Sequence, residues 1–265
     1  MITIYSSGDA FLHENQDYLN ENRYLSTFFF LDAPLIKAVD KKQYALKVFN
    51  NDKTLLILKF PPFNALLYGD EDCLEEFLSF ARDQDYEFED VMCANNIGDQ
   101  LVEIAPQVLE ESYHLHVGMD FMRTSEITEE SSKDVEIPTL DDVDEIAECS
   151  ERFIRDCKLS DQVNKERIAQ TINDYRILRR DGKIVAMSHI SVDAEDSRRV
   201  SMVYTRPEYR GKGYARKVVN VAKNDILAHW SYATLNVDQS NPISNHLYES
   251  LGFRKVFSHG IYVKN

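Results

Sequence analysis

Two glycines one residue apart stand where the chain could hold a phosphate group. They lie in VYTRPEYRGKGYARKVV (residues 203–219), in a chain with nine glycines among 265 residues. A strand is expected to end at Pro207, which has no amide proton to donate, and an amphipathic helix to begin near Lys212. The free amides of a helix N-terminus bind anions, glycines let a ligand approach the backbone, and Arg210 and Lys212 add positive charge. The pattern therefore predicts a phosphate-binding loop.

Two better-known phosphate loops do not fit this segment. A Walker loop requires Ser or Thr after its Gly-Lys pair, whereas Lys212 is followed by Gly213 and Tyr214. A dinucleotide-binding fingerprint requires a third small residue where Arg216 stands. Both are therefore excluded as descriptions of the loop.

A second segment, NVDQSNPISNHLYESLGF (residues 236–253), contains a candidate proton donor. Asn241 is a good helix N-cap, Pro242 suits the first helical position, and Gly252 suits the helix end. Tyr248 follows Asn241 by two helical turns on the same face, so both side chains can line one cleft. A tyrosine hydroxyl that points into a cleft can protonate a leaving thiolate.

The two segments, in this order and about 30 residues apart, resemble the GCN5-related N-acetyltransferase (GNAT) superfamily over about residues 134–265. RGKGYA (residues 210–215) is similar to the family's acyl-CoA pyrophosphate loop. The preceding residues 203–205 are similar to the strand whose backbone pairs with pantetheine. The residues of both motifs resemble those of two-domain members of the glycine N-acyltransferase and FR47-like branch. In such proteins the front half is often a degenerate GNAT-like domain.

The resemblance implies an α/β (α+β) fold with a mixed, centrally splayed sheet flanked by helices, and acetyl-CoA as the acyl donor. It implies direct attack of an amine on the thioester, backbone stabilisation of the oxyanion near Val203 and Thr205, and Tyr248 as general acid. No metal is expected. The residues that the resemblance places at acetyl-CoA are Val203, Tyr204, Thr205, Arg210, Gly211, Lys212, Gly213, Tyr214, Ala215 and Asn241.

An amine is mostly protonated at pH 7, so a base or a water chain must remove its proton. His189, in the middle of its expected strand and near Ser191, is one candidate base, and Asp193 and Glu195 are others. A buried histidine that only packs against the cleft wall is the structural alternative. Likewise, Tyr248 can be a packing aromatic and Asn241 a plain N-cap.

Periodicity predicts the elements that must position these residues. In the back half the order is strand, two helices, three strands, helix, strand, helix and a closing hairpin. The expected ranges are 135–137, from 141, 165–172, 175–180, 183–192, 199–205, 212–229, 232–237 and 242–251. In the front half, a hairpin over 44–60, a helix from 74 to 81, and strands near 88–93 and 113–121 indicate an α/β mixture. The expected domains are 1–125 and 134–265, joined by a polar linker over 126–133.

Charge separates the two halves. Residues 1–130 hold 9 basic and 25 acidic side chains, whereas residues 131–265 hold 21 and 20. A front half this acidic repels phosphate backbones, so a nucleic-acid partner is not expected. These acidic residues either form a solvated surface or help to recruit a cationic substrate such as an amine.

Composition limits the remaining classes. No apolar run approaches the roughly 20 residues that span a bilayer, and the start of the chain lacks the pattern of a secretory signal. Four cysteines without CxxC spacing indicate reduced thiols in a cytoplasmic protein, not a zinc site. His114 and His116 share a strand face without a third ligand, which favours an ordinary half-exposed face over a metal site.

The sequence therefore predicts a two-domain, cytoplasmic N-acetyltransferase acting on a primary amine of a small molecule. Two alternatives stay open: a non-catalytic acyl-CoA-binding sensor or interaction module, and a protein N-terminal or lysine acetyltransferase. The length of the acyl chain and the oligomeric state, a homodimer included, stay open as well.

Overall fold

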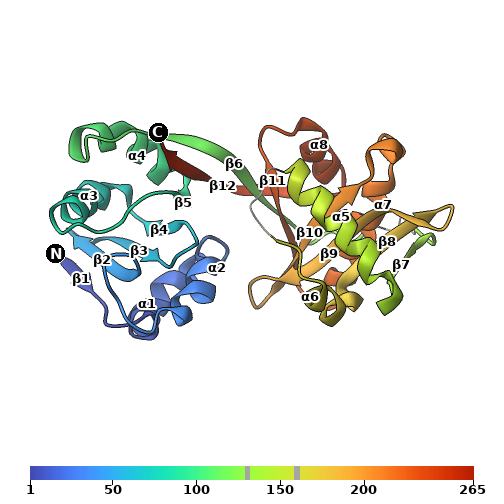
Figure 1. Cartoon of the computed structure of the whole chain (residues 1–265), viewed down its shortest axis with the longest axis horizontal. Helices are drawn as coiled ribbons and strands as arrows, with labels where there is room; N and C mark the ends of the chain where they lie inside the picture. The colour runs from blue at the N-terminus through green and yellow to red at the C-terminus, as the bar shows by residue number, and fades with distance from the viewer. Residues whose placement is uncertain (129–131, 158–161) are drawn as a thin grey trace. The chain divides into compact units, whose positions relative to one another are not determined.

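The computed structural model describes residues 1–128, 132–157 and 162–265 (Figure 1). The chain divides into two compact units. Unit 1 comprises Met1–Asp120, Asp238–Ser240 and Phe257–Asn265, and unit 2 comprises Phe121–Val237 and Asn241–Val256. Both mix helices and strands, which confirms the predicted fold class.

Unit 1 is a sheet with two helices on each face. Its strands lie in the order β1-β2-β3-β4-β5-β12, followed by the first part of β6. The parallel pair is β4 with β5, and β1 to β4 pair antiparallel. The elements are β1 (Ile2–Ile4), α1 (Gly8–Glu21), α2 (Arg23–Asp32), β2 (Tyr44–Asn50), β3 (Lys53–Lys59), β4 (Ala65–Gly69), α3 (Leu74–Asp83), β5 (Val91–Ala94), α4 (Asn95–Val108), β6 (Tyr113–Thr124) and β12 (Arg254–Lys264), with short 3-10 turns η1 (Ala33–Leu35) and η2 (Glu71–Cys73).

Alternation along the strands explains why both faces of this sheet are covered. In β3, Leu55 and Ile57 pack toward α3 and α4, whereas Leu56 and Leu58 pack toward α1 and α2. All four side chains are fully buried. Because successive side chains of a strand point to opposite faces, a continuous apolar run of this kind needs a layer on each side.

Unit 2 repeats the same order of helices and strands. Its strands lie in the order β7-β8-β9-β10-β11, followed by the second part of β6. β10 pairs antiparallel with β9 and parallel with β11. The elements are β7 (Val135–Glu136), η3 (Leu140–Asp142), α5 (Val143–Asp156), α6 (Lys165–Gln170), η4 (Ile172–Asp174), β8 (Tyr175–Arg180), β9 (Lys183–Val192), β10 (Ser197–Thr205), η5 (Pro207–Tyr209), α7 (Tyr214–Leu227), β11 (Tyr232–Asp238) and α8 (Pro242–Ser250).

The helices of unit 2 again occupy both faces of the sheet (Figure 1). Ile177, Ile184 and Met187 pack with α5 and α6, whereas the intervening side chains Leu178 and Val185 pack against α7. α5 is strongly amphipathic, because its apolar side chains recur at helical spacing and face the sheet. The two faces therefore carry separate sets of side chains, and a site residue of unit 2 belongs to one or the other.

Three expectations from the sequence differ from the structure. The closing hairpin is wrong, because Arg254–Lys264 is one extended strand. In it Gly260 pairs with Cys93 of β5, and a Cβ at Gly260 would meet Leu115 Cδ1 at 2.5 Å. The helix expected over 212–229 begins at Tyr214. N-terminal helices over residues 8–32 and a helix over 95–108 were not predicted.

The expected domain boundaries also differ from the compact units. Residues 257–265 belong to unit 1 although they follow unit 2 in the chain, and residues 121–125 belong to unit 2. Part of the predicted linker over 126–133, residues 129–131, lies outside the described residues. Within the described part of the chain, no helix is long and apolar enough to cross a membrane.

Candidate functional site

The two parallel strands at the centre of unit 2 separate halfway along their length. β10 and β11 pair at Ser197 with Tyr232, at Arg198 with Ala233 and at Arg199 with Thr234. Among the described residues of these strands this pairing ends there, although β10 continues to Thr205 and β11 to Asp238. The backbone of the second half of β10 therefore has an edge that can pair with a ligand, since backbone amides and carbonyls need partners.

A β-bulge lies at the point where the strands separate. The register of β10 against β9 shifts between Ser201 and Tyr204, and Met202 has a φ of +50°. A positive φ is uncommon for a residue other than glycine, and bulges redirect the side chains that follow them. After the bulge, Val203 packs in the apolar cluster of α7 and α8, whereas Tyr204 packs with α5. The bulge thus sets the direction of the residues that the sequence placed at the thioester.

Thr205, the last residue of β10, carries an unsatisfied polar atom. Its Oγ1 is buried and has no hydrogen-bond partner among the described residues. Its carbonyl oxygen accepts a bond of 3.0 Å from Arg210 Nε. A buried polar atom without a partner is costly, so it indicates a position that a ligand can satisfy.

The predicted phosphate loop follows directly. Gly211 and Gly213 have φ values of +76° and +75°, and a Cβ built on either would meet no atom within 4 Å. Glycine is therefore required by the left-handed backbone, and the space beside the loop is open. Gly213 is the N-cap of α7 and offers no side chain to the first helical amides. The amides of Tyr214, Ala215 and their neighbours at this helix start have no intrahelical acceptor, and they can bind an anion.

The cations of the loop are already engaged with the protein. Arg210 Nη2 forms an ion pair of 2.7 Å with Asp156 at the end of α5. Lys212 Nζ lies 3.5 Å from the carbonyl oxygen of Glu208 and 4.9 Å from the centre of the Tyr209 ring. Both cationic side chains are exposed, so they can exchange these partners for phosphate. The exchange costs little, because exposed ion pairs are worth about 0–1 kcal/mol.

Helix α8 holds the second motif. Asn241 Oδ1 accepts a bond of 3.1 Å from the Ser244 amide, so the N-cap prediction is confirmed. Tyr248 is 7% exposed and lies in the same apolar cluster as Val203, with its ring edge-on to Phe253 at 6.2 Å. Burial raises the pKa of Tyr248, so the phenol stays protonated at neutral pH. Tyr248 and Val203 thus belong to the same apolar cluster, while Asn241 is exposed at the start of the helix.

His189 belongs to the other face of the sheet. The centre of its ring lies 4.5 Å from that of the Tyr175 ring, and Tyr175 packs in the cluster of α5 and α6. Its Nδ1 lies 3.3 Å from Ser201 Oγ, and its Nε2 is buried with no partner among the described residues. Burial lowers the pKa of His189 to about 4. Of the other candidate bases, Asp193 forms an ion pair with Arg199 and accepts a bond from Thr234 Oγ1.

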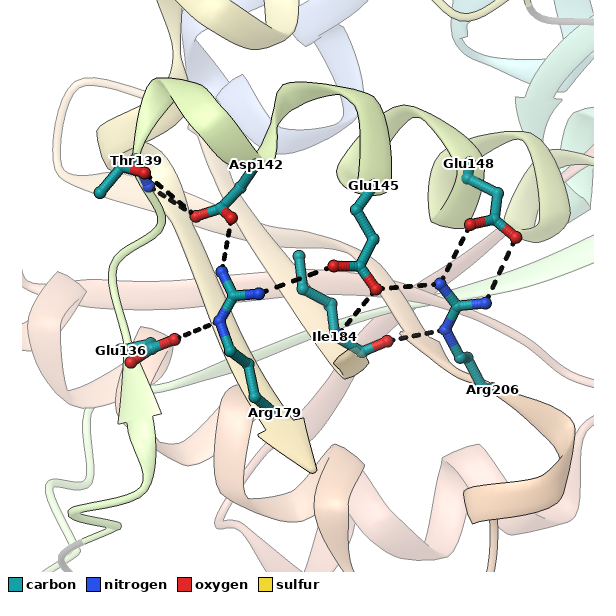
Figure 2. Close-up of polar contacts among 8 residues, drawn as sticks. All are labelled: Glu136, Thr139, Asp142, Glu145, Glu148, Arg179, Ile184 and Arg206. Carbon is teal, nitrogen blue, oxygen red and sulfur yellow. Dashed lines mark hydrogen bonds and ion pairs between the residues drawn. The ribbon is translucent and has the colours of Figure 1, made fainter. Parts of the chain in front are cut away.

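Sequence reasoning missed a charged network that leads into the loop (Figure 2). Arg206, directly before Pro207, is 7% exposed and pairs with Glu145 and Glu148 of α5. Arg179 of β8 pairs with Glu136, Asp142 and, at 3.6 Å, with Glu145. The signal in the sequence was the spacing of Glu145 and Glu148, which puts both carboxylates on one face of a helix.

Unit 1 has the same order of elements but not the same loop chemistry. Strand β4 ends at Gly69, and Asp70-Glu71-Asp72 follow it before α3, with three carboxylates and no cation. A Cβ at Gly69 would meet the Thr54 carbonyl oxygen at 2.0 Å and Tyr18 Oη at 2.9 Å. Asp70 Oδ2 accepts a bond of 2.9 Å from the Thr54 amide. The protein's own atoms therefore occupy the space beside Gly69, whereas the space beside Gly211 and Gly213 is open.

Comparisons with known proteins agree with this geometry. Residues 140–253 match the model of the Acetyltransferase (GNAT) family. No curated protein matches the sequence. The fold is similar to that of an acetyltransferase of the GNAT family from Colwellia psychrerythraea, with 12% identity, coverage of 100% of this chain and 98% of the other, and a TM-score of 0.65.

Two further solved structures are similar over the whole chain. A GCN5-related N-acetyltransferase from Sphaerobacter thermophilus has 13% identity, coverage of 100% and 95%, and a TM-score of 0.62. A tandem GNAT protein from the clavulanic acid biosynthesis pathway has 8% identity, coverage of 100% and 98%, and a TM-score of 0.57. At these identities the likeness concerns the fold, and it extends over both units. Residues 140–253 therefore match the GNAT acetyltransferase family, as the loop and helix motifs predicted.

Proposed function

We propose that the protein is an N-acetyltransferase that transfers the acetyl group of acetyl-CoA to the primary amine of a small molecule. The observation that carries the proposal is the position of the phosphate loop at the end of a strand that leaves its parallel neighbour. The loop offers open space, helix-start amides that have no intrahelical acceptor, and two cations, and the second half of β10 offers a backbone edge a few residues long that does not pair with β11. A phosphate-bearing ligand with an extended amide arm, such as CoA, fits this combination.

Each part of the site has a task in the proposed reaction. The amides that follow Gly213, with Arg210 and Lys212, hold the pyrophosphate. The edge of β10 beyond the bulge pairs with the pantetheine amides, and amides near Val203 and Thr205 polarise the thioester carbonyl. Thr205 Oγ1, which has no partner among the described residues, is one more group able to bond the donor.

The chemical step is a direct transfer. The neutral amine attacks the thioester carbonyl carbon, a carbon–nitrogen bond forms, and the carbon–sulfur bond breaks. Tyr248 gives its proton to the departing thiolate, and the proton of the amine leaves to a base or to water, so protons balance. The phenol of Tyr248 carries its proton before the step, and because burial raises its pKa, it gives the proton up only as the thiolate charge develops.

The base stays a prediction. The imidazole of His189, with a pKa of about 4, is neutral at pH 7 but holds a proton far less tightly than an alkylamine does. A proton that His189 accepts must therefore pass on at once. Its contact with Ser201 Oγ at 3.3 Å, and the bond of 3.2 Å between Ser191 Oγ and Ser201 Oγ, provide polar neighbours for such a transfer.

The acceptor class rests on charge. Unit 1 carries most of the excess acidic side chains of the chain, and an acidic surface attracts amines that are cationic at neutral pH. This favours a small cationic acceptor over an anionic one. A peptide amine, as in a protein N-terminal or lysine acetyltransferase, is the alternative acceptor that the assay must include.

The testing experiment combines binding and turnover. Calorimetric titration of the full chain with acetyl-CoA measures the donor site, and release of free thiol measures transfer to pooled amino acids, polyamines and peptide amines. Turnover with a small-amine pool would support the proposal and name the acceptor class. Tight binding of acetyl-CoA with no turnover in any pool would favour the non-catalytic sensor. If acetyl-CoA did not bind, the proposal would fail.

A further inference from the structure

We propose that Arg206, held by Glu145 and Glu148, is a positioning residue that sets the geometry of the phosphate loop. The inference rests on the proposed function of that loop as a pyrophosphate site. Arg206 does not reach into the open space beside the glycines. It acts on the ligand through the backbone that it fixes.

Arg206 stands at the junction of the strand and the loop. It follows Thr205, the end of β10, and precedes the 3-10 turn η5 that leads to Arg210. Its own amide donates to the Val185 carbonyl oxygen at 2.9 Å, and its carbonyl oxygen accepts from the Tyr209 amide at 2.9 Å. The backbone of Arg206 therefore joins β9 on one side to the turn before the loop on the other.

The side chain of Arg206 secures this junction from the α5 face. Nε donates to the Ile184 carbonyl oxygen at 2.7 Å, and the two terminal nitrogens bond the two oxygens of Glu148 at 3.3 and 3.2 Å (Figure 2). Nη2 also lies 3.2 Å from Glu145 Oε1. That same oxygen accepts the Ile184 amide at 2.9 Å. A planar guanidinium with a bidentate carboxylate fixes orientation as well as distance.

Tyr209 and Tyr214, on either side of the loop, pack against the cluster that contains Leu178 and Val185, whereas the glycines between them have no such contact. At Gly211 and Gly213 nothing lies within 4 Å in the direction of a side chain, and the ties of Arg210 and Lys212 are exposed at the surface. Arg206, by contrast, is 7% exposed, and each of its three side-chain nitrogens donates to a partner. Since anion binding by backbone amides requires the amides to converge on one point, the buried anchor at the start of the loop determines how well they do so.

The test separates the phosphate part of the donor from its thioester part. Acetyl-CoA and S-acetylpantetheine carry the same reacting group, but acetylpantetheine lacks the pyrophosphate. Arg206→Lys keeps the charge and loses the bidentate geometry, and Arg206→Gln loses both. The matched control is Arg179→Lys, which loses the same kind of paired geometry in the same network. Its short ion pairs are to Glu136 of β7 and Asp142 of η3, and its contact with Glu145 is longer, at 3.6 Å.

Both Arg206 variants are expected to raise KM for acetyl-CoA about tenfold or more, with KM for acetylpantetheine within about twofold of the parent chain. Arg179→Lys is expected to change neither KM by more than about twofold. Three results would overturn the proposal: an effect of Arg206→Gln without one of Arg206→Lys, an equal rise of KM for both donors, or an equal effect of Arg179→Lys. The first would mean that only the charge matters, and the other two would mean a general loss of structure.

A milder variant keeps the test usable if the Arg206 variants do not fold. Glu148→Gln removes one charge from a side chain that is 46% exposed, so folding should survive. We expect a rise in KM for acetyl-CoA of about threefold with acetylpantetheine unaffected, and an unchanged KM would count against the proposal. Failure of the proposed function is a different result, because the parent chain itself would then not bind acetyl-CoA.

Discussion

Gly213→Ala is the perturbation whose two effects can be separated most cleanly. The residue has a φ of +75°, and an added Cβ would meet no protein atom within 4 Å. The substitution therefore causes backbone strain but no clash inside the protein. If a phosphate group sits against this loop, the new methyl group occupies the space that the ligand needs. Stability and ligand affinity should then respond in different proportions.

The size of each effect follows from the geometry. An alanine forced into the left-handed region costs about 1–2 kcal/mol. For a chain of this length that lowers the Tm by roughly 2–8 °C. On the ligand side, loss of one hydrogen bond to a charged oxygen costs about 1.5–3 kcal/mol, or roughly a 10- to 150-fold rise in Kd.

Gly182 provides the matched control. It has a φ of +76° in the turn between β8 and β9, and a Cβ there also meets nothing within 4 Å. Gly182→Ala therefore introduces the same strain at a place that has no part in the proposed site. Tm from thermal unfolding and Kd for CoA from calorimetry would be measured for both variants. The two should lose similar stability, and only Gly213→Ala should lose CoA affinity. Equal affinity for CoA in the two variants would refute the assignment of the loop.

Four further outcomes are expected. Tyr248→Phe removes the proposed acid and should lower kcat by about 10²-fold with Kd for CoA nearly unchanged; an unchanged rate would take Tyr248 out of the mechanism. Asp156→Asn releases Arg210 from its ion pair and should tighten CoA binding by about two- to threefold at low salt, as measured by calorimetry, whereas weaker binding would show that Asp156 positions Arg210. The folded pKa of His189, about 4, is below the unfolded value of 6.5, so stability that is present above pH 6.5 is lost as the pH falls toward 4. Between pH 7 and pH 5 the free energy of unfolding should fall by about 2 kcal/mol through this group, and His189→Gln should lack that fall. An equal drop in Tm for both proteins would contradict the burial of the imidazole. Finally, calorimetry should give one CoA per chain, since the residues after β4 in unit 1 are acidic and protein atoms occupy the space beside Gly69; two CoA molecules per chain would contradict this expectation.

The elements of unit 2 could be predicted from the sequence because their signals are local. The Asp181-Gly182 turn and the apolar alternation on either side of it predicted β8 and β9 to within a residue. The start of α7 was predicted two residues early, because the amphipathic pattern extends into the loop. Gly213 has a left-handed backbone conformation and is the N-cap, so the first helical residue is Tyr214. Periodicity identifies a helix better than it locates its first residue.

The parts that could not be predicted depend on partners distant in the chain. Residues 254–264 follow α8, yet His259 to Tyr262 pair with β5, which precedes them by more than 160 residues. No local pattern indicates this pairing, and the closing hairpin expected at the end of the chain was wrong for that reason. The bulge at Met202 is similar, because its cause is the register between β10 and β9 and not the preference of methionine.

The candidate site divides in the same way. Arg210, Lys212 and the two glycines form a continuous stretch whose residue types already carry the chemistry, so the loop was visible in the sequence. The role of Arg206 could not be predicted from the sequence, because its partners on α5 lie about 60 residues away in the chain. An arginine before a proline does not by itself indicate a function.

The two units show that the fold alone does not make the site. In both, the first strand of a parallel pair is followed by a loop and a helix that lead to the second strand. The described residues of β4 and β5 pair at two positions, and those of β10 and β11 at three. In unit 1 the loop carries Asp70, Glu71 and Asp72, and Lys53 already pairs with Asp72. A phosphate would meet carboxylates there, and the Thr54 carbonyl occupies the space beside Gly69. The separation of the strands is thus a property of the architecture, whereas phosphate binding needs open glycines, cations and a buried anchor such as Arg206, and the described residues combine these in unit 2.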